Sequence, residues 1–278
     1  MKLSVFHKAE SQLAEGPYWS KSHSELFWVD IITKTLFRKS LQGKMISYSL
    51  PETLTSFYVN DSIVFGCTNS GFCSFDLDTH EFERLIEIEA ASETNRSNDG
   101  KCDGKGGFVF GTMDWEGNQR SGNIYYVDTL RLDYTILDTG FYIPNGFAFN
   151  ADATEILIAD SFLKIIYKYN YDPEKRLLKN KRIFADLSAS ESSPDGMATS
   201  GQNLVWNAEW GGAMLTQYDL SGEITSQITL PVLKPTSCAF GGDEDSLLFI
   251  TSARTEMNEH QLKKYPDSGS VLCLDLNG

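Results

Sequence analysis

LFWVD at residues 26–30 is the first of six short runs of branched and aromatic residues, which recur about every 44 residues along this 278-residue chain. The other five are IVFGC at 63–67, FVFGT at 108–112, ILIAD at 156–160, LVWNA at 204–208 and LLFIT at 247–251. Runs of this length, bounded by clusters of Gly, Asn, Asp and Ser, are typical of β-strands. A repeat of this period with several strands per unit is the signature of a β-propeller.

Four of the runs are followed by a second β-type run that carries an Asp, as in NIYYVD and SVLCLDLNG. We therefore predict an all-β fold, a six-bladed β-propeller with four-stranded blades. No Pro/Gly/Ser-rich linker marks a boundary, so residues 1–278 are expected to form a single domain. KLSVFHKA at 2–9 is a lone strand, and VLCLDL at 271–276 lacks a final partner. Pairing the two would close the ring through the N-terminal strand and leave no unpaired edge.

The composition limits the kinds of partner. A net charge of −14 argues against nucleic acid and against anionic membranes. No apolar run is long enough to span a bilayer, and the polar N-terminus does not resemble a secretory signal. We expect a cytoplasmic monomer or weak homo-oligomer. Five cysteines without CxxC spacing fit buried thiols in a reducing compartment, with a Cys67–Cys73 bridge as the alternative for an exported chain.

Polar residues recur in phase with the repeat. The tripeptides PNG at 144–146 and PDG at 194–196 each precede a β run, and four oxygen-bearing side chains lie about ten residues ahead of theirs: Glu15, Asn98, Asn145 and Asp195. Each residue alone is typical of a Gly-containing turn. Equivalent positions in a propeller are related by rotation about its axis, so together they predict oxygen ligands that converge at one end of the channel. Two carboxylates and two amides suit a hard divalent ion. The sixth unit offers Thr236 at this phase, a weaker ligand.

Other chemistries lack their motifs. The chain has no GxSxG, HExxH or Walker sequence, and none of its four histidines lies at ligand spacing from another.

Several longer segments are distinctive: AEGPYW at 14–19, NRSNDGKCD at 95–103, PNGFAF at 144–149, PDGMA at 194–198 and LPVLKPTSCAFGG at 230–242. Together they resemble the regucalcin/gluconolactonase family, also called senescence marker protein. The resemblance runs from about residue 11 to the C-terminus. It implies a six-bladed propeller that holds one divalent ion in its channel and hydrolyses sugar lactones to aldonic acids.

Carried over by position, the resemblance assigns the metal ligands to Glu15, Asn145 and Asp195, with Asp195 also the acid/base. It assigns substrate binding to Arg96, Asn98 and Glu116. Many members carry an aromatic residue where this chain has Ser97, which changes the expected pocket wall. The ligand types favour Ca²⁺, with Zn²⁺, Mn²⁺, Mg²⁺ and Fe²⁺ as alternatives.

The expected substrate is a gluconolactone-like lactone or a pentonolactone. The sequence leaves open whether Asp195 takes the proton of the attacking water or only orients water activated by the ion. It also leaves two rival functions, a non-catalytic calcium-binding propeller and a phosphotriesterase-like hydrolase. The joint presence of Arg96, Asn98 and Glu116 favours an enzyme over the first. The polar segment 113–122 is predicted to bring Trp115 and Glu116 over the channel mouth, and Trp210 is a further candidate for the pocket.

Overall fold

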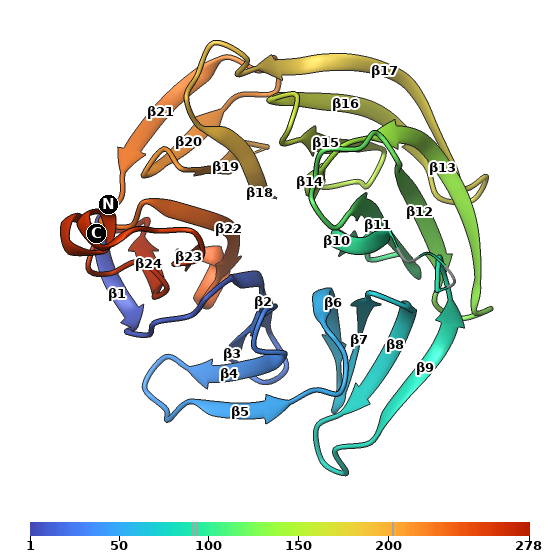
Figure 1. Cartoon of the computed structure of the whole chain (residues 1–278), viewed down its shortest axis with the longest axis horizontal. Helices are drawn as coiled ribbons and strands as arrows, with labels where there is room; N and C mark the ends of the chain where they lie inside the picture. The colour runs from blue at the N-terminus through green and yellow to red at the C-terminus, as the bar shows by residue number, and fades with distance from the viewer. Residues whose placement is uncertain (91, 93, 202) are drawn as a thin grey trace.

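The computed structural model describes residues 1–90, 92, 94–201 and 203–278. Within these ranges nearly all regular structure is β, and the strands form six four-stranded antiparallel sheets. The sheets are arranged as blades around a central axis (Figure 1). The predicted six-bladed propeller is therefore confirmed.

The strands follow the same order in each blade, from the axis outward, as Figure 1 shows. The first strands are β2 (Ala14–Ser20), β6 (Leu54–Asn60), β10 (Asn95–Cys102), β14 (Pro144–Phe149), β18 (Ser193–Thr199) and β22 (Lys234–Gly241). The second strands are β3 (Glu25–Asp30), β7 (Ile63–Thr68), β11 (Gly107–Asp114), β15 (Glu155–Asp160), β19 (Val205–Trp210) and β23 (Leu247–Ala253). The third strands are β4 (Thr35–Ser40), β8 (Gly71–Asp76), β12 (Gly122–Asp128), β16 (Ile165–Asp172), β20 (Met214–Tyr218) and β24 (Val271–Asp275). The outer strands are β5 (Ile46–Ser49), β9 (Phe82–Glu87), β13 (Asp133–Phe141), β17 (Leu177–Asp186), β21 (Ile224–Thr229) and β1 (Lys2–His7). A short helix, α1 (Glu259–Lys264), and a 3₁₀ turn, η1 (Asp243–Asp245), lie in the last blade's connections.

The six apolar runs that predicted the repeat are the second strands. They are buried almost throughout, because both faces of each strand pack against neighbouring blades; in β11 every residue is buried. A strand covered on both faces reads as a continuous apolar run rather than an alternating one.

The N-terminal strand closes the ring. β1 pairs with β24 in antiparallel register, with Leu3 opposite Leu274 and Val5 opposite Leu272. It supplies the fourth strand of the last blade, which otherwise comes from the C-terminus (Figure 1). The predicted closure is confirmed, and it removes the open edge of β24.

Two further features concern membrane-spanning helices and the cysteines. In the described part of the chain, helices are too short and too polar to cross a membrane. All five cysteines are free thiols, four of them buried, with Cys102 partly exposed.

Every first strand carries a shift in pairing register, the mark of a β-bulge. The shifts fall at Glu15/Tyr18, Leu54/Ser56, Ser97/Gly100, Asn145/Ala148, Pro194/Met197 and Pro235/Cys238. The four in-phase residues lie at these bulges, so the expectation that PNG and PDG form turns is wrong. Both tripeptides lie inside strands, β14 and β18. Gly146 has a positive φ of 60°, and a Cβ there would lie 2.4 Å from the Asp195 carbonyl oxygen, so the bulge requires glycine.

Candidate metal and substrate site

All six predicted site residues line one cavity of about 700 Å³ at one end of the channel. They are Glu15 on β2, Arg96 and Asn98 on β10, Glu116 after β11, Asn145 on β14 and Asp195 on β18. Four different blades therefore contribute residues to the cavity, as expected when equivalent positions are related by rotation about the propeller axis. Trp115, Phe162 and Trp210 also line this cavity and give it an aromatic wall.

Glu15 and Asp195 are both destabilised as charged groups. Burial, and then the charge of Asp99, raise the pKa of Glu15 to about 8. Burial, and then the charge of Glu15, raise the pKa of Asp195 well above its usual value. Three carboxyls in a desolvated channel repel one another unless protons or a cation neutralise them.

The donor set fits a divalent cation. Oδ1 of Asp195 is a buried oxygen that accepts no hydrogen bond from the residues described. The Asn145 amide nitrogen donates to the Ser161 hydroxyl at 3.2 Å, and its oxygen accepts from the Gly146 N–H at 3.2 Å, which leaves a second lone pair on that oxygen for a cation. Around the axis no three His, Cys, Asp or Glu side chains form a ligand cluster in the described ranges. The candidate set is instead two carboxylates and an amide, which is oxygen chemistry suited to Ca²⁺ or Mg²⁺.

Asp99 is a functional candidate that the sequence did not single out. One carboxylate oxygen accepts hydrogen bonds from the backbone N–H of Gly146 at 2.8 Å and of Phe147 at 3.4 Å, both on the next blade. The other accepts from Gly100 at 2.7 Å. Burial raises the pKa of Asp99. In a regular strand the side chains of Asn98 and Asp99 would point to opposite faces. The bulge in β10 changes this alternation and brings both residues to the channel.

Arg96 is held against the cavity wall. One guanidinium nitrogen donates to Oδ1 of Asn98 at 3.0 Å and to the Ser97 carbonyl at 2.9 Å. The guanidinium carbon lies 5.8 Å from the centre of the Trp115 ring. Burial lowers the pKa of Arg96 to about 10, against the opposing charges of Glu15 and Asp114, so the side chain remains a cation at neutral pH. Its remaining donors are available to a ligand.

Both polar atoms of the Asn98 amide already form hydrogen bonds with other residues. Its oxygen accepts from Arg96, and its nitrogen donates to the Pro144 carbonyl at 3.0 Å. Thr236, the in-phase residue of the sixth blade, does not line the cavity. Its fully buried hydroxyl donates to the Ala14 carbonyl at 2.5 Å and lies 2.8 Å from the Thr251 hydroxyl. This pairing explains why a residue with the right phase does not act as a ligand.

The loop after β11 places Trp115 and Glu116 at the cavity. The Asp114 carboxylate accepts the backbone N–H of Glu116 at 3.1 Å and of Gln119 at 2.7 Å, which fixes the start of the loop. Trp115 is 50% exposed. Trp206, by contrast, is buried in blade packing.

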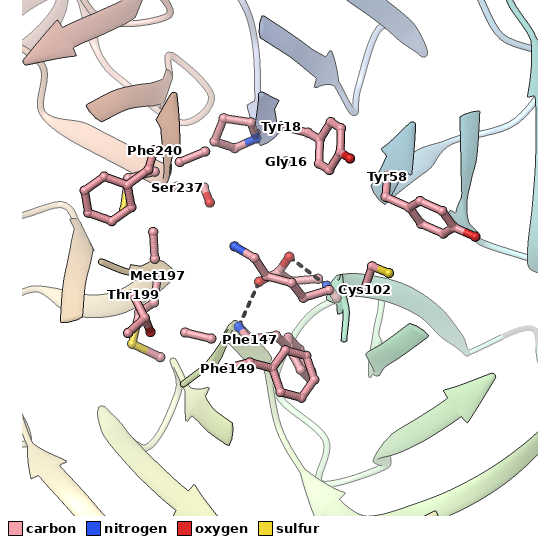
Figure 2. A pocket seen from close by; sticks show the side chains of 18 of the residues that line it. Gly16, Tyr18, Tyr58, Cys102, Phe147, Phe149, Met197, Thr199, Ser237 and Phe240 are labelled. Atoms are coloured by element: carbon pink, nitrogen blue, oxygen red, sulfur yellow. Dashed lines mark hydrogen bonds between the residues drawn. The ribbon is translucent and has the colours of Figure 1, made fainter. Parts of the chain in front are cut away.

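A second cavity of about 280 Å³ lies further along the same first strands. Tyr18, Tyr58, Phe147, Met197 and Phe240 surround it (Figure 2). The dashed bond to the Phe147 nitrogen in Figure 2 is the one accepted by Asp99. Asp99 lines this second cavity, and its charge is among the causes, after burial, that raise the pKa values of Glu15 and Asp195 in the first.

The chain is similar along nearly its whole length to known proteins. L-arabinolactonase of Azospirillum brasilense is 32% identical over 278 residues, covering 97% of this chain and 90% of the relative. 6-deoxy-6-sulfogluconolactonase of Pseudomonas putida is 29% identical over 281 residues, covering 99% and 95%. Both are named for hydrolysis of a cyclic carboxylic ester. The crystal structure of regucalcin from Agrobacterium tumefaciens strain C58, described as a calcium-binding protein, matches with a TM-score of 0.93 at 26% identity, covering 97% of this chain and 92% of that one.

A family model described as the SMP-30/Gluconolactonase/LRE-like region matches residues 13–254. The match begins just before β2 and extends through β23, so it includes all six first strands and every candidate ligand. The chain therefore belongs to the SMP-30/gluconolactonase/LRE-like family.

Proposed function

We propose that this protein is a sugar lactonase that hydrolyses an aldonolactone, of the pentono- or gluconolactone type, to the aldonic acid with the help of one divalent ion. The observation that carries the proposal is the buried, unpartnered Oδ1 of Asp195 beside Glu15, in the same cavity as Arg96. The names of the lactonase relatives support the substrate class. The calcium-binding description of the regucalcin structure supports Ca²⁺ as the first ion to test.

Glu15, Asn145 and Asp195 would hold the ion through oxygen atoms. The bound ion would polarise the lactone carbonyl and make a neighbouring water more acidic. Asp195 is the proposed acceptor of that water's proton, because its carboxylate lines the cavity and one of its buried oxygens accepts no hydrogen bond from the described residues.

Arg96 and Glu116 are proposed to bind the sugar. The fork of Arg96 offers donors to hydroxyl or ring oxygens, and the Glu116 carboxylate accepts from hydroxyls. Asn98 acts mainly by orienting Arg96, since both ends of its amide already contact protein groups. The aromatic wall formed by Trp115 and Trp210 excludes water from the carbon face of the substrate.

A phosphotriesterase-like hydrolase is the rival enzyme, because the same oxygen ligands can activate water toward phosphorus. The pairing of Arg96 and Glu116 in the cavity favours the sugar lactone, since a donor and an acceptor for hydroxyl groups suit a polyhydroxylated substrate and not a phosphotriester. A purely regulatory calcium-binding propeller would need the metal ligands but neither Arg96 nor Glu116.

The test is a substrate panel on one preparation. Xylono-, arabinono-, galactono- and gluconolactone are compared with an aryl phosphate and a fluorophosphate, each with Ca²⁺, Zn²⁺, Mn²⁺, Mg²⁺ or Fe²⁺ added to stripped protein. We expect hydrolysis of at least one sugar lactone and little of either phosphorus ester. The reverse order would establish the phosphotriesterase, and no hydrolysis with tight Ca²⁺ binding would establish the regulatory protein.

We also propose that residues 1–278 act as one domain in a reducing, cytoplasmic setting. The support is the set of five free thiols and a ring closed by both ends of the chain.

A further inference from the structure

The same contact recurs beside each of the three candidate metal ligands. The residue that precedes each ligand presents its carbonyl to a side chain on the preceding blade of the ring. Thr236 donates to Ala14 before Glu15, Asn98 donates to Pro144 before Asn145, and Ser161 donates to Pro194 before Asp195. The distances are 2.5, 3.0 and 2.6 Å. Of the three, the Ser161 contact joins two blades that each carry a candidate ligand, the fourth with Asn145 and the fifth with Asp195.

Ser161 makes one of these contacts and, with the same hydroxyl, a hydrogen bond to a candidate ligand in its own blade. It follows β15 at the end of the second strand of the fourth blade and lines the candidate cavity. Its oxygen accepts a hydrogen bond from the Asn145 amide at 3.2 Å, and its proton is donated to the Pro194 carbonyl. The Ser161 hydroxyl therefore links the side chain of one ligand, Asn145, to the backbone next to another, Asp195.

The direction of these bonds decides what Ser161 does. Because the hydroxyl has one proton and gives it to Pro194, it must accept from the nitrogen of Asn145 rather than donate to its oxygen. This fixes the flip of the amide and leaves the oxygen for a cation. The Asp195 carbonyl is held in turn by the Asn207 side-chain nitrogen at 3.1 Å.

Resting on the proposed function, we propose that Ser161 is a positioning residue for the metal site, which sets the Asn145 oxygen and the Asp195 carboxylate at a fixed separation through one hydroxyl. Thr236 is its counterpart for Glu15 across the closure of the ring. Groups that orient metal ligands commonly change metal affinity by 10–100-fold when removed. Ser161 touches no reacting atom in this scheme and acts through the ligands.

The test compares Ser161→Ala with Ser161→Thr and Ser237→Ala. Thr keeps the hydroxyl. Ser237 is a buried serine that lines the second cavity and has no hydroxyl partner in the described structure, so it controls for loss of a serine near the axis. Calorimetric titration with Ca²⁺ should show that Ser161→Ala weakens binding about tenfold, while the other two variants stay within threefold of wild type. Thermal unfolding of the metal-free proteins should differ little among the three.

Unchanged Ca²⁺ affinity in Ser161→Ala would overturn the proposal, as would an equal loss in Ser237→Ala. A wild-type protein that binds no divalent ion would refute the proposed function instead. In that case the crystal structure of metal-free Ser161→Ala decides the positioning role: a reoriented Asn145 amide supports it, and unchanged Asn145 and Asp195 side chains overturn it.

Discussion

Burial, and then the carboxyl of Glu15 on the first blade, raise the pKa of Asp195 on the fifth, although the two residues lie far apart in the sequence. The closed ring brings them together at the axis, where burial and the charges of neighbouring carboxyls, Asp99 among them, make the ionised form of both unfavourable. Negative charge on these carboxyls is unfavourable while the site is empty, and a bound cation would stabilise it. The stability of the protein should therefore depend both on pH and on the bound ion.

The first prediction concerns metal-free stability. Between the ordinary glutamate pKa of 4.5 and the raised value of about 8, the native state holds a proton on Glu15 that the unfolded chain has released. The unfolded state binds fewer protons there, so stability falls as pH rises through this range. Melting temperature measured from about pH 5 to pH 8 in chelator should decrease, and less steeply in Glu15→Gln than in wild type. The exposed Glu191→Gln serves as control. Equal slopes in all three proteins would contradict the coupling.

The second prediction separates stability from function at Asp195. Asp195→Asn removes a buried charge while nearly preserving shape, so the metal-free protein should melt at a higher temperature than wild type at pH 8. Lactonase activity should be lost and Ca²⁺ affinity should fall at least 100-fold, since a charged ligand is gone. Asp243→Asn, on the exposed η1 turn, should change neither quantity. Intact Ca²⁺ binding by Asp195→Asn would refute this residue as a ligand.

The third prediction concerns Thr236. Its position in the repeat alone suggests a weak ligand that the site could lose. In the structure its buried hydroxyl instead donates to the Ala14 carbonyl and so holds the backbone next to Glu15. Thr236→Val keeps the shape and removes the hydroxyl, and it should lower the unfolding free energy by about 1–3 kcal/mol because a buried acceptor is left unsatisfied. Denaturant unfolding measures this, with Thr236→Ser as the variant that keeps the bond. Wild-type stability in Thr236→Val would show that the contact is incidental.

The fourth prediction tests substrate recognition. Arg96→Ala should leave Ca²⁺ affinity nearly unchanged and lower kcat/KM for a sugar lactone at least tenfold, about 1.4 kcal/mol of transition-state stabilisation. Arg96→Lys keeps the charge but not the planar fork, and should recover only part of the loss. Aliphatic lactones without hydroxyls should lose less if Arg96 binds the sugar hydroxyls. Full activity of Arg96→Ala on every lactone would remove Arg96 from the substrate site.

The fifth prediction concerns closure of the ring. Deleting residues 1–9 removes β1 and exposes the edge of β24, so the melting temperature should fall and aggregation should increase. A synthetic peptide of residues 1–9 added in excess should partly restore stability, which distinguishes a missing strand from general damage. An unchanged melting curve would contradict the structural role of β1.

The sequence predicted the parts of this molecule that repeat. The second strands are apolar because neighbouring blades cover both faces, and that pattern gave six blades and the phase that selected Glu15, Asn98, Asn145 and Asp195. Asp99 was not predicted as a site residue, because neighbouring side chains in a regular strand point to opposite faces. The bulge in β10 brings it to the channel. Ser161 was not singled out because its hydroxyl joins Asn145 in its own blade to Pro194 in the next, and the spacing of like residues does not encode a bridge of this kind.

The most direct measurement is a pH-stat titration of fully stripped protein with Ca²⁺, in the presence of a saturating sugar lactone such as L-arabinonolactone. Stripped protein should be inactive, and acid release should rise linearly with added ion to a break at one ion per chain. Asp195→Asn should show no rise. Full lactonase activity in the stripped protein, or no lactone hydrolysis with Ca²⁺ or any of the other four ions, would contradict a metal-dependent sugar lactonase.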